Sequence, residues 1–429
     1  MVNVIKDKEY EDFFEKLVER AQFDDAQYAA AASKIVAGVK KDGDKALFEY
    51  TKEFDKVDIN KGNVKVSRKE IEEAYSKVDK NMQRIIQLSA DRIRDFHSKQ
   101  KRNSWMDLDE AGTILGQLII PMESCGVYVP GGTAAYPSSV LMNIIPAQVA
   151  GVKNIVMVTP PQEGGKINPV VLVSADIAGV TDIYKVGGAQ SIAALAFGTE
   201  SIPKVDKIVG PGNIYVALAK REVYGYVSID SIAGPSEILI IADKDANPKY
   251  VAADMLSQAE HDMLASSVVV TDSQELADKV AKEVEIQTNK LSRKDIVEKS
   301  LRDFGAIIVT DTMEEAIKIS NDIAPEHLEI CTRAPFEILP KIKNAGAIFL
   351  GEYTPEPVGD YMAGPNHVLP TNGTARFFSP LCVDDFIKKP SILSFTKESL
   401  EPLYKDVIDF AESEELTAHA NALRVRYDE

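Results

Sequence analysis

Apolar residues recur at helical spacing through most of residues 8–102. Phe13, Phe14 and Leu17 follow this spacing near the start, and Ile86 and Ile93 follow it further along. A repeat of three to four residues puts these side chains on one face of a helix. The sequence therefore predicts an N-terminal region that is helical almost throughout.

Beyond this region, short apolar runs alternate with amphipathic segments. Strands are predicted at residues 118–120, 126–129, 155–158, 182–186, 207–209, 238–241, 267–270, 306–309 and 347–350. Helices are predicted at residues 137–150, 169–178, 189–197, 213–224, 247–263, 274–303 and 313–323. Such alternation favours parallel sheets with helices on both faces, in two α/β units. Residues 351–380 are rich in Pro and Gly and predict a loop, and residues 400–426 predict a terminal helical arm.

Composition narrows the class of protein. The 429 residues are 45% hydrophobic and 27% charged, which is ordinary for a soluble globular protein. The net charge of −17 disfavours nucleic acid and anionic membranes as partners. No apolar run approaches transmembrane length, and the charged N-terminus lacks a signal peptide. The three cysteines are too few and too widely spaced for a disulfide framework, so a cytoplasmic location is expected.

Four of the five histidines lie in short polar clusters. Gln258 and His261 are three residues apart on a predicted helix, so both can face one ion. Asp360 lies in the Pro-rich loop and His419 on the terminal arm. Taken singly, these residues read as solvated helix positions, a turn residue and a surface histidine. Together their nitrogen and oxygen donors suit Zn²⁺ best, although no CxxC pair or HExxH motif accompanies them.

Two of the remaining three histidines have two interpretations each. Glu326 and His327 are an adjacent carboxylate and imidazole that could share acid–base work, or they could be polar residues at a helix terminus. His367, in a Gly-Pro-Asn-His turn, could contact a substrate or only its own backbone. His97 lies beside Ser and Lys on a predicted helix and is expected on the solvated surface.

Glycine turns follow three of the predicted strands. They are Gly131-Gly132, Gly187-Gly188 and Gly210-Pro211-Gly212, and each precedes a helix. None is a G-x-G-x-x-G fingerprint, and ordinary strand-to-helix turning would explain any one of them. Because ligands of open α/β sheets bind at the edge where such turns gather, the three together favour a nucleotide.

Longer sequence motifs, more specific than these single residues and turns, are spread over the whole chain. They are Gly126 to Met142, Gly210 to Asn213, Ala233 to Glu237, Gln258 to Asp262, Ala324 to Glu329 and Gly364 to His367, which runs on to Ala375-Arg376. On these residues the sequence resembles the histidinol dehydrogenase family, essentially from end to end. The resemblance implies oxidation of L-histidinol to L-histidine through L-histidinaldehyde, the last two steps of histidine biosynthesis, with NAD and one zinc ion per subunit.

The resemblance also implies a role for particular residues. Glu326 and His327 correspond to the catalytic acid–base pair. The implied zinc ligands are Gln258, His261, Asp360 and His419. The implied substrate contacts are Ser236, His367 and Glu414, together with the zinc ligands and His327. The implied NAD contacts are Tyr128, Gln190 and Asn213.

The fold implied by the resemblance is two incomplete Rossmann-like domains with parallel sheets, one inserted in the other. The expected divisions are a helical segment at 1–23, a first domain at 24–127 and 238–379, an inserted domain at 128–237, and a C-terminal arm at 380–429. Family members are homodimers in which the arm reaches the partner, so Glu414 and His419 would complete the neighbouring site.

Three other functions compete with this one. A related zinc and NAD dehydrogenase could act on another small amino or sulfonated alcohol, although the presence of both Glu414 and His419 favours histidinol. A zinc hydrolase would use the metal to hold a nucleophilic water, but the glycine turns speak for a nucleotide. A non-catalytic binding protein agrees least with the acid–base pair.

Overall fold

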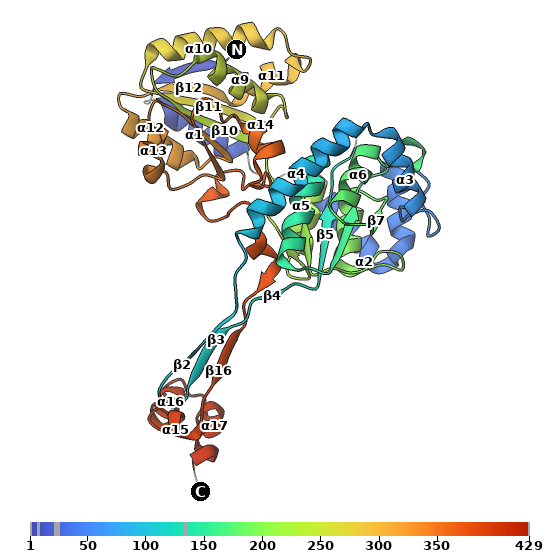
Figure 1. The fold of residues 1–429 in the computed structure, drawn as a ribbon, viewed down its shortest axis with the longest axis vertical. Helices are drawn as coiled ribbons and strands as arrows, with labels where there is room; N and C mark the ends of the chain where they lie inside the picture. Colours follow the sequence, from blue (N-terminus) through green and yellow to red (C-terminus); the bar gives the residue numbers. More distant parts are fainter. Residues whose placement is uncertain (1, 7–8, 21–25, 132–134, 428–429) are drawn as a thin grey trace. The chain divides into compact units, whose positions relative to one another are not determined.

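The structure, a computed structural model, describes residues 2–6, 9–20, 26–131 and 135–427. It separates into two compact units (Figure 1), one formed by residues 1–100 with 122–386 and the other by residues 101–121 with 387–429. The predicted boundary between residues 23 and 24 and the predicted glycine Gly132 lie outside the described residues.

The first unit contains a six-stranded parallel sheet. In spatial order its strands are β1 (Asn3–Lys6), β12 (Gly305–Val309), β11 (Ser266–Thr271), β10 (Glu237–Ala242), β13 (His327–Cys331) and β14 (Ala347–Leu350). Apart from the edge strand β1, the order runs outward from β10 in both directions, as in a Rossmann fold. The central strands are buried on both faces, which is why they read as continuous apolar runs.

Helices cover both faces of this sheet. One face packs against α9 (Pro248–Ala259), α10 (Gln274–Thr288) and α11 (Lys294–Phe304). The other packs against α1 (Tyr10–Arg20), α12 (Met313–Ile323) and α13 (Pro335–Ile338). The short helix α14 (Glu356–Val358) and the π-helical turn η4 (Gly359–Ala363) follow β14.

A five-stranded parallel sheet also belongs to the first unit. In spatial order its strands are β7 (Ile183–Tyr184), β6 (Asn154–Val158), β5 (Ser124–Tyr128), β8 (Lys207–Val209) and β9 (Ser228–Ile229). The order again runs outward from the first strand of the series. Two parallel sheets of this order confirm the predicted α/β, Rossmann-like fold class. The described chain between α1 and β10, apart from residues 101–121, forms the second sheet with its helices.

The helices that pack on the five-stranded sheet come both from the segment before its first strand, β5, and from the segments between its strands. One face packs against α3 (Arg68–Lys77), α4 (Lys80–Ser98), α5 (Pro137–Ala150) and α6 (Pro169–Ile177). The other packs against α2 (Ala26–Phe54), α7 (Gly188–Phe197) and α8 (Ile214–Val223). Helices α2, α3 and α4 therefore pack on this sheet, which differs from the prediction that placed residues 24–127 with the other domain. No change of composition near residue 127 marks the change of sheet, so the sequence could not reveal this packing.

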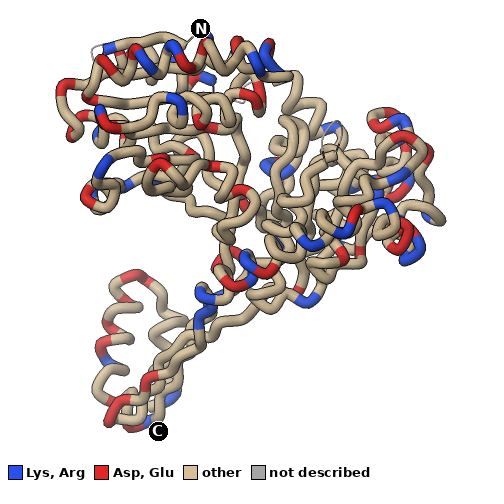
Figure 2. Tube along the Cα trace, turned by 45° about the horizontal axis from the view of Figure 1, so that its top comes forward, with Lys and Arg blue, Asp and Glu red and all other residues tan. Residues whose placement is uncertain are grey.

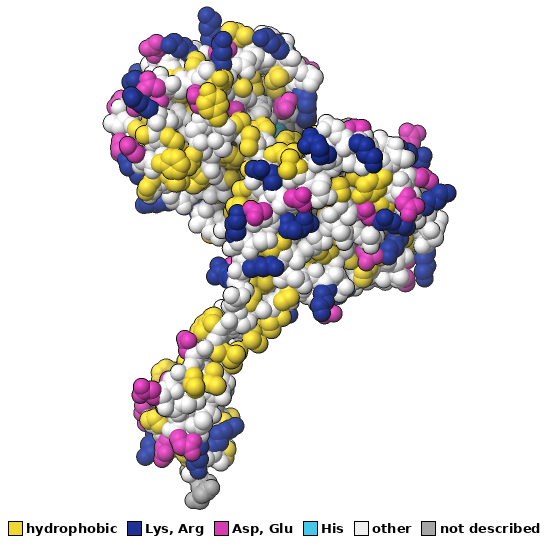
Figure 3. All heavy atoms as spheres, viewed as in Figure 1, with side chains coloured by type: hydrophobic (Ala, Val, Ile, Leu, Met, Phe, Trp, Pro, Cys, Tyr) yellow, Lys and Arg dark blue, Asp and Glu magenta, His cyan; other side chains and the backbone are white. Residues whose placement is uncertain are grey.

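The second unit is a small sheet with helices. Antiparallel strands β2 (Trp105–Leu108), β3 (Ile114–Gln117) and β16 (Ser391–Ser394) form one sheet, and β4 (Ile120–Pro121) pairs with β15 (Ile387–Lys388). Its helices are α15 (Lys397–Leu400), α16 (Tyr404–Ser413) and α17 (Thr417–Tyr427). Apolar side chains gather on the surface of this unit (Figure 3), among them Met106, Leu108 and Leu393, which are 60%, 71% and 68% exposed.

The surface charge and the state of the cysteines agree with the composition. Lysine and arginine alternate with acidic residues along the surface helices, so the net negative charge is dispersed (Figure 2). All three cysteines are free thiols, as predicted. Among the described residues, no helix is long and apolar enough to cross a membrane.

Candidate active site

Glu326 and His327 lie at the start of β13, a central strand of the six-stranded sheet. The backbone of Glu237, at the start of the neighbouring β10, holds both side chains. Its N–H donates to Glu326 Oε2 at 2.9 Å, and His327 Nδ1 lies 3.0 Å from its carbonyl oxygen. Because a carbonyl can only accept, Nδ1 carries the proton and donates, which leaves Nε2 as the basic atom of the imidazole.

Burial changes the proton affinity of the pair in opposite directions. Glu326 and His327 are only 7% and 4% exposed. Burial lowers the pKa of His327, although the nearby Asp360 carboxylate partly opposes this. Burial raises the pKa of Glu326 well above its ordinary value, and the carboxylates of Glu237, Glu356 and Asp360 raise it further. The imidazole is therefore neutral at pH 7 and able to accept a proton.

A cluster of carboxylates and an amide lies beside His327. Ligand atoms of His327, Glu356 and Asp360 all lie within 4.8 Å of one another. Gln258, on α9, is fully buried next to Glu356. With its amide nitrogen turned toward Glu356, it donates to both carboxylate oxygens at 3.1 Å, and its oxygen accepts from the N–H of Glu237. Donors of this kind, an imidazole, carboxylates and an amide, are those that zinc sites use.

The first unit brings together three of the four predicted metal ligands. Gln258 and Asp360 belong to the cluster itself. His261 lies in the turn after α9, where its N–H donates to the carbonyl of Gln258 at 3.2 Å. Its charge is close enough to lower the pKa of Glu356, which burial raises to about 7. The fourth predicted ligand, His419, is an exposed residue of α17 in the second unit, and Glu414 is exposed at the end of α16.

Glu356 is a residue of this cluster that the sequence did not reveal. It begins α14 between Pro355 and Pro357, a setting that reads as an ordinary turn. The structure buries it to 2% exposure, where it accepts from Ser257 Oγ at 3.0 Å. Its own N–H donates to Glu329 Oε1 at 2.9 Å. The one signal in the sequence was an acidic residue with a proline on each side.

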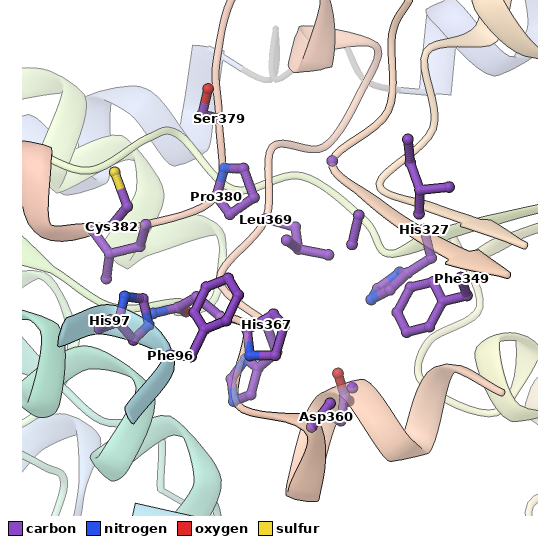
Figure 4. A pocket seen from close by; sticks show the side chains of 18 of the residues that line it. Phe96, His97, His327, Phe349, Asp360, His367, Leu369, Ser379, Pro380 and Cys382 are labelled. Carbon is purple, nitrogen blue, oxygen red and sulfur yellow. The ribbon is translucent and has the colours of Figure 1, made fainter. Parts of the chain in front are cut away.

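A cavity of about 450 Å³ opens beside the cluster. His327, Asp360 and His367 all line it (Figure 4). Burial lowers the pKa of His367, and its Nε2 is buried with no protein partner in the described chain, so it is able to bind a ligand atom. Ser236, half-buried, precedes Glu237 in the chain and does not line this cavity.

The prediction that His97 lies on the solvated surface was wrong. His97 is fully buried at the end of α4, and it lines the same cavity. Its Nδ1 lies 2.8 Å from Gln100 Oε1, and burial lowers its pKa. Its polar neighbours in the sequence suggested solvent, but they point to other faces of the helix.

A second cavity, of about 630 Å³, lies at the carboxyl edge of the five-stranded sheet. All three predicted NAD residues, Tyr128, Gln190 and Asn213, line it together with Gly131 and Gly188. The predicted glycine turns that the structure describes do follow strands of one sheet, namely β5, β7 and β8. Gln190 is 1% exposed, and its Oε1 is buried with no hydrogen-bond partner in the described chain.

A buried ion pair fixes the turn that carries Asn213. Gly210 has φ +117°, and a Cβ there would lie 2.0 Å from the carbonyl oxygen of Tyr128, so only glycine fits. Its N–H donates to Asp230 Oδ2 at 2.7 Å, and its carbonyl accepts from Lys220 Nζ at 3.1 Å. Lys220 and Asp230 also pair with each other, both buried.

Comparison with known proteins identifies the family. The family model described as histidinol dehydrogenase matches residues 18–427. The chain belongs to the histidinol dehydrogenase family. It is therefore a dehydrogenase, an oxidoreductase, as the sequence predicted.

Relatives of this dehydrogenase match it over nearly their full length. A histidinol dehydrogenase of Caldanaerobacter subterraneus subsp. tengcongensis is 59% identical over 96% of each chain. One of Clostridium acetobutylicum is 55% identical over 97% of this chain and 96% of its own. The crystal structure of histidinol dehydrogenase from Elizabethkingia anophelis matches with a TM-score of 0.93 and 40% identity, covering 100% of this chain and 98% of that one.

Proposed function

We propose that this dehydrogenase oxidises L-histidinol to L-histidine in two successive steps, with NAD as oxidant and one zinc ion per subunit. In each step the substrate carbon gives up a hydride and its hydroxyl oxygen gives up a proton, and one water enters between the steps to supply the second carboxylate oxygen. Two NAD⁺ are therefore reduced for each histidinol. When bound, zinc would hold the substrate's imidazole and amine in place, and NAD would accept the hydrides.

One observation carries the proposal. A neutral, correctly oriented imidazole and a carboxyl group lie side by side at His327 and Glu326, next to the metal-type donors Gln258 and Asp360. In this mechanism His327 Nε2 takes the proton of the alcohol. Glu326 takes a proton from the water that adds to the aldehyde while His327 returns its proton to the carbonyl oxygen, and the neutral His327 then takes the proton of the resulting hydrate.

The donor set supports zinc in this role. Gln258, His261 and Asp360 would supply an amide oxygen, an imidazole nitrogen and a carboxylate oxygen, and His419 would supply a second imidazole. A cation there would also compensate the several carboxylates that gather around Glu326, and so favour its ionised form. His367, with its buried unpaired Nε2, and Ser236 and Glu414 would contact the substrate.

The second cavity supports NAD. It is lined by Tyr128, Gln190 and Asn213, it carries the unpaired Gln190 Oε1, and it borders strand-end glycine turns where a backbone can approach phosphates closely. We also propose a cytoplasmic homodimer whose second unit reaches the partner's site. The exposed apolar side chains of β2, β3 and β16 support such a contact.

The proposal is tested by measuring how many NADH form for each histidinol consumed. Protein of known zinc content is given limiting L-histidinol and excess NAD⁺, and NADH is counted per histidinol consumed. A ratio near two supports the four-electron oxidation. A ratio near one would point to a related dehydrogenase acting on another small amino or sulfonated alcohol, and no NADH at all would remove the proposal.

A further inference from the structure

Asp55 is a carboxylate of the second cavity that has no assigned role. It follows directly on the last residue of α2, where its N–H donates to the carbonyl of Thr51 at 2.9 Å. Its side chain lines the cavity with Tyr128, Gln190 and Asn213. The helix end, five-stranded sheet and cavity all belong to the first unit, so this position is part of a single packed body.

Asp55 has no cation to neutralise it. Within the described chain it takes part in no ion pair, and neither lysine nor arginine lines the cavity. Among the described residues that line it, the one other charged side chain is the carboxylate of Glu163. Burial raises the pKa of Asp55 to about 6, so it is still mostly ionised at pH 7.5. A carboxylate without a cation beside it attracts neutral hydrogen-bond donors and disfavours a phosphate placed directly against it, whereas the pyrophosphate of a dinucleotide would lie at the glycine turns.

The described part of the protein offers the Asp55 carboxylate only one weak hydrogen bond. Its one polar protein contact is Gln190 Nε2, at the limiting distance of 3.5 Å. That contact turns Gln190 Oε1 the other way, where it is buried and unpaired. One carboxylate oxygen of Asp55 therefore has no donor in the described chain, and the other has only this long contact. A ribose offers such donors as adjacent hydroxyl groups, whereas a 2′-phosphate at neutral pH offers almost none and adds nearly two negative charges.

We propose that Asp55 accepts a hydrogen bond from a ribose hydroxyl of the dinucleotide and thereby selects the form without a 2′-phosphate. The chemistry is that of the acidic residue in dinucleotide folds that binds ribose hydroxyls, here supplied from the end of a helix instead of a strand. This inference rests on the proposed use of NAD.

The test compares NAD⁺ and NADP⁺ as oxidants of L-histidinol. The variant Asp55→Asn removes the charge at almost constant size. Its ratio of kcat/KM for NADP⁺ to that for NAD⁺ should rise at least about tenfold, which corresponds to roughly 1.4 kcal/mol. Most of the change should come from KM, with kcat at saturating NAD⁺ largely kept. Asp55→Glu, which keeps the charge, should keep the preference for NAD⁺.

Asp58→Asn is the matched control. It removes the same charge three residues away, where Asp58 is exposed, pairs with Lys52 at 3.1 Å and does not line this cavity. Its ratio should stay within about twofold of the wild type, because an exposed charge is screened by solvent.

The outcomes separate the two proposals. If the wild type reduces neither dinucleotide with histidinol, the proposed function fails, and calorimetric titration of NAD⁺ and NADP⁺ into the same proteins still tests Asp55. An Asp55→Asn ratio equal to that of the control, in protein with an unchanged melting temperature, overturns the inference. So does a wild type that uses or binds both dinucleotides equally well. Should Asp55→Asn not fold, Asp55→Ser in the same titration replaces it.

Discussion

Glu326 and His327 are neighbours in the sequence, and burial gives them complementary properties. The same loss of solvent that lowers the pKa of the His327 imidazole raises the pKa of the Glu326 carboxyl. The backbone of Glu237 orients both side chains. Its N–H binds Glu326, and its carbonyl oxygen binds His327. Acid–base work can thus be divided between two side chains that the fold positions together.

Glu326→Gln should separate the two oxidation steps. The amide keeps the size and can still accept from the N–H of Glu237, but it cannot take a proton from water. We expect oxidation of histidinaldehyde to slow by about 10²–10⁴-fold, the usual contribution of a general base, and oxidation of histidinol to the aldehyde to slow much less. Single-turnover rates on the two substrates measure this. Equal losses on both would contradict the division of labour.

The pH profile of alcohol oxidation should report His327. Only the neutral imidazole can take the proton, and the group becomes protonated as pH falls through its pKa. Because burial lowers that pKa from 6.5, the rate at saturating substrate should hold down to about pH 6.5 and decline below it. His327→Asn should be slow throughout and lack this limb. A wild-type rate already falling between pH 8 and 7 would contradict the direction of the shift.

His261→Asn should weaken metal retention. It removes one of the proposed imidazole ligands from the turn after α9, while its exposed side chain contributes little to the core. We expect most of the zinc to be lost on dialysis against a mild chelator, measured by elemental analysis, with the melting temperature little changed. The control is Asp262→Asn, which keeps the acceptor for the N–H of Leu264 and should retain zinc like the wild type. Full retention by His261→Asn would remove it from the ligand set.

At the scale of elements, the two cavities differ in the strand ends that they adjoin, carboxyl ends in one sheet and amino ends in the other. The nucleotide-type cavity lies where the strands of the five-stranded sheet end, as is usual for open α/β sheets. Glu326 and His327, the proposed acid–base pair, lie where β10 and β13 begin. The first arrangement depends on glycine turns such as that at Gly210, and a buried ion pair supports this turn.

Lys220→Met should damage both stability and cofactor affinity. It leaves Asp230 buried without its cation and removes the donor to the Gly210 carbonyl. Breaking a buried pair in this way costs about 3–5 kcal/mol of unfolding free energy, measurable by urea denaturation. We also expect a higher KM for NAD⁺ with a smaller effect on kcat. Arg221→Met, on the exposed face of the same helix, is the control and should change neither. A stable Lys220→Met with unchanged KM would contradict the role of the pair.

At the scale of the whole molecule, the proposed site needs residues of both units. The first unit supplies Gln258, His261, Asp360 and the catalytic pair, and His419 belongs to the second. If the second unit serves a partner subunit, one complete site requires two chains. The exposed apolar strands of that unit would then be buried in the dimer.

Mixing two inactive variants should restore activity. In a hybrid dimer of His327→Asn and His419→Asn, exchange of the second unit creates one site with both lesions and one with neither. After unfolding and refolding together, random pairing should recover about a quarter of wild-type activity. Each variant refolded alone is the control. Absence of recovery, with dimers confirmed by mass, would show that His419 serves its own chain.

The sequence by itself determined the fold class, most elements and most candidate residues. Buried parallel strands and amphipathic helices are local patterns, so the helix at Met313–Ile323 and the strand at Lys207–Val209 were predicted to the residue. The edge strand β1 and most strands of the second unit escaped prediction, since they are short and mostly exposed, and the strand predicted at residues 118–120 overlaps β4 only at Ile120.

Only the tertiary structure decided how the site is built. It placed Glu326 and His327 at the start of a central strand. In the sequence these polar residues could equally mark the end of a helix, because the backbone groups that bind them belong to another strand. The tertiary structure also buried Glu356 and His97, whose neighbours in sequence suggested turn and solvent. Burial and long-range hydrogen bonds depend on segments that meet only when the chain folds, and local pattern carries no record of them.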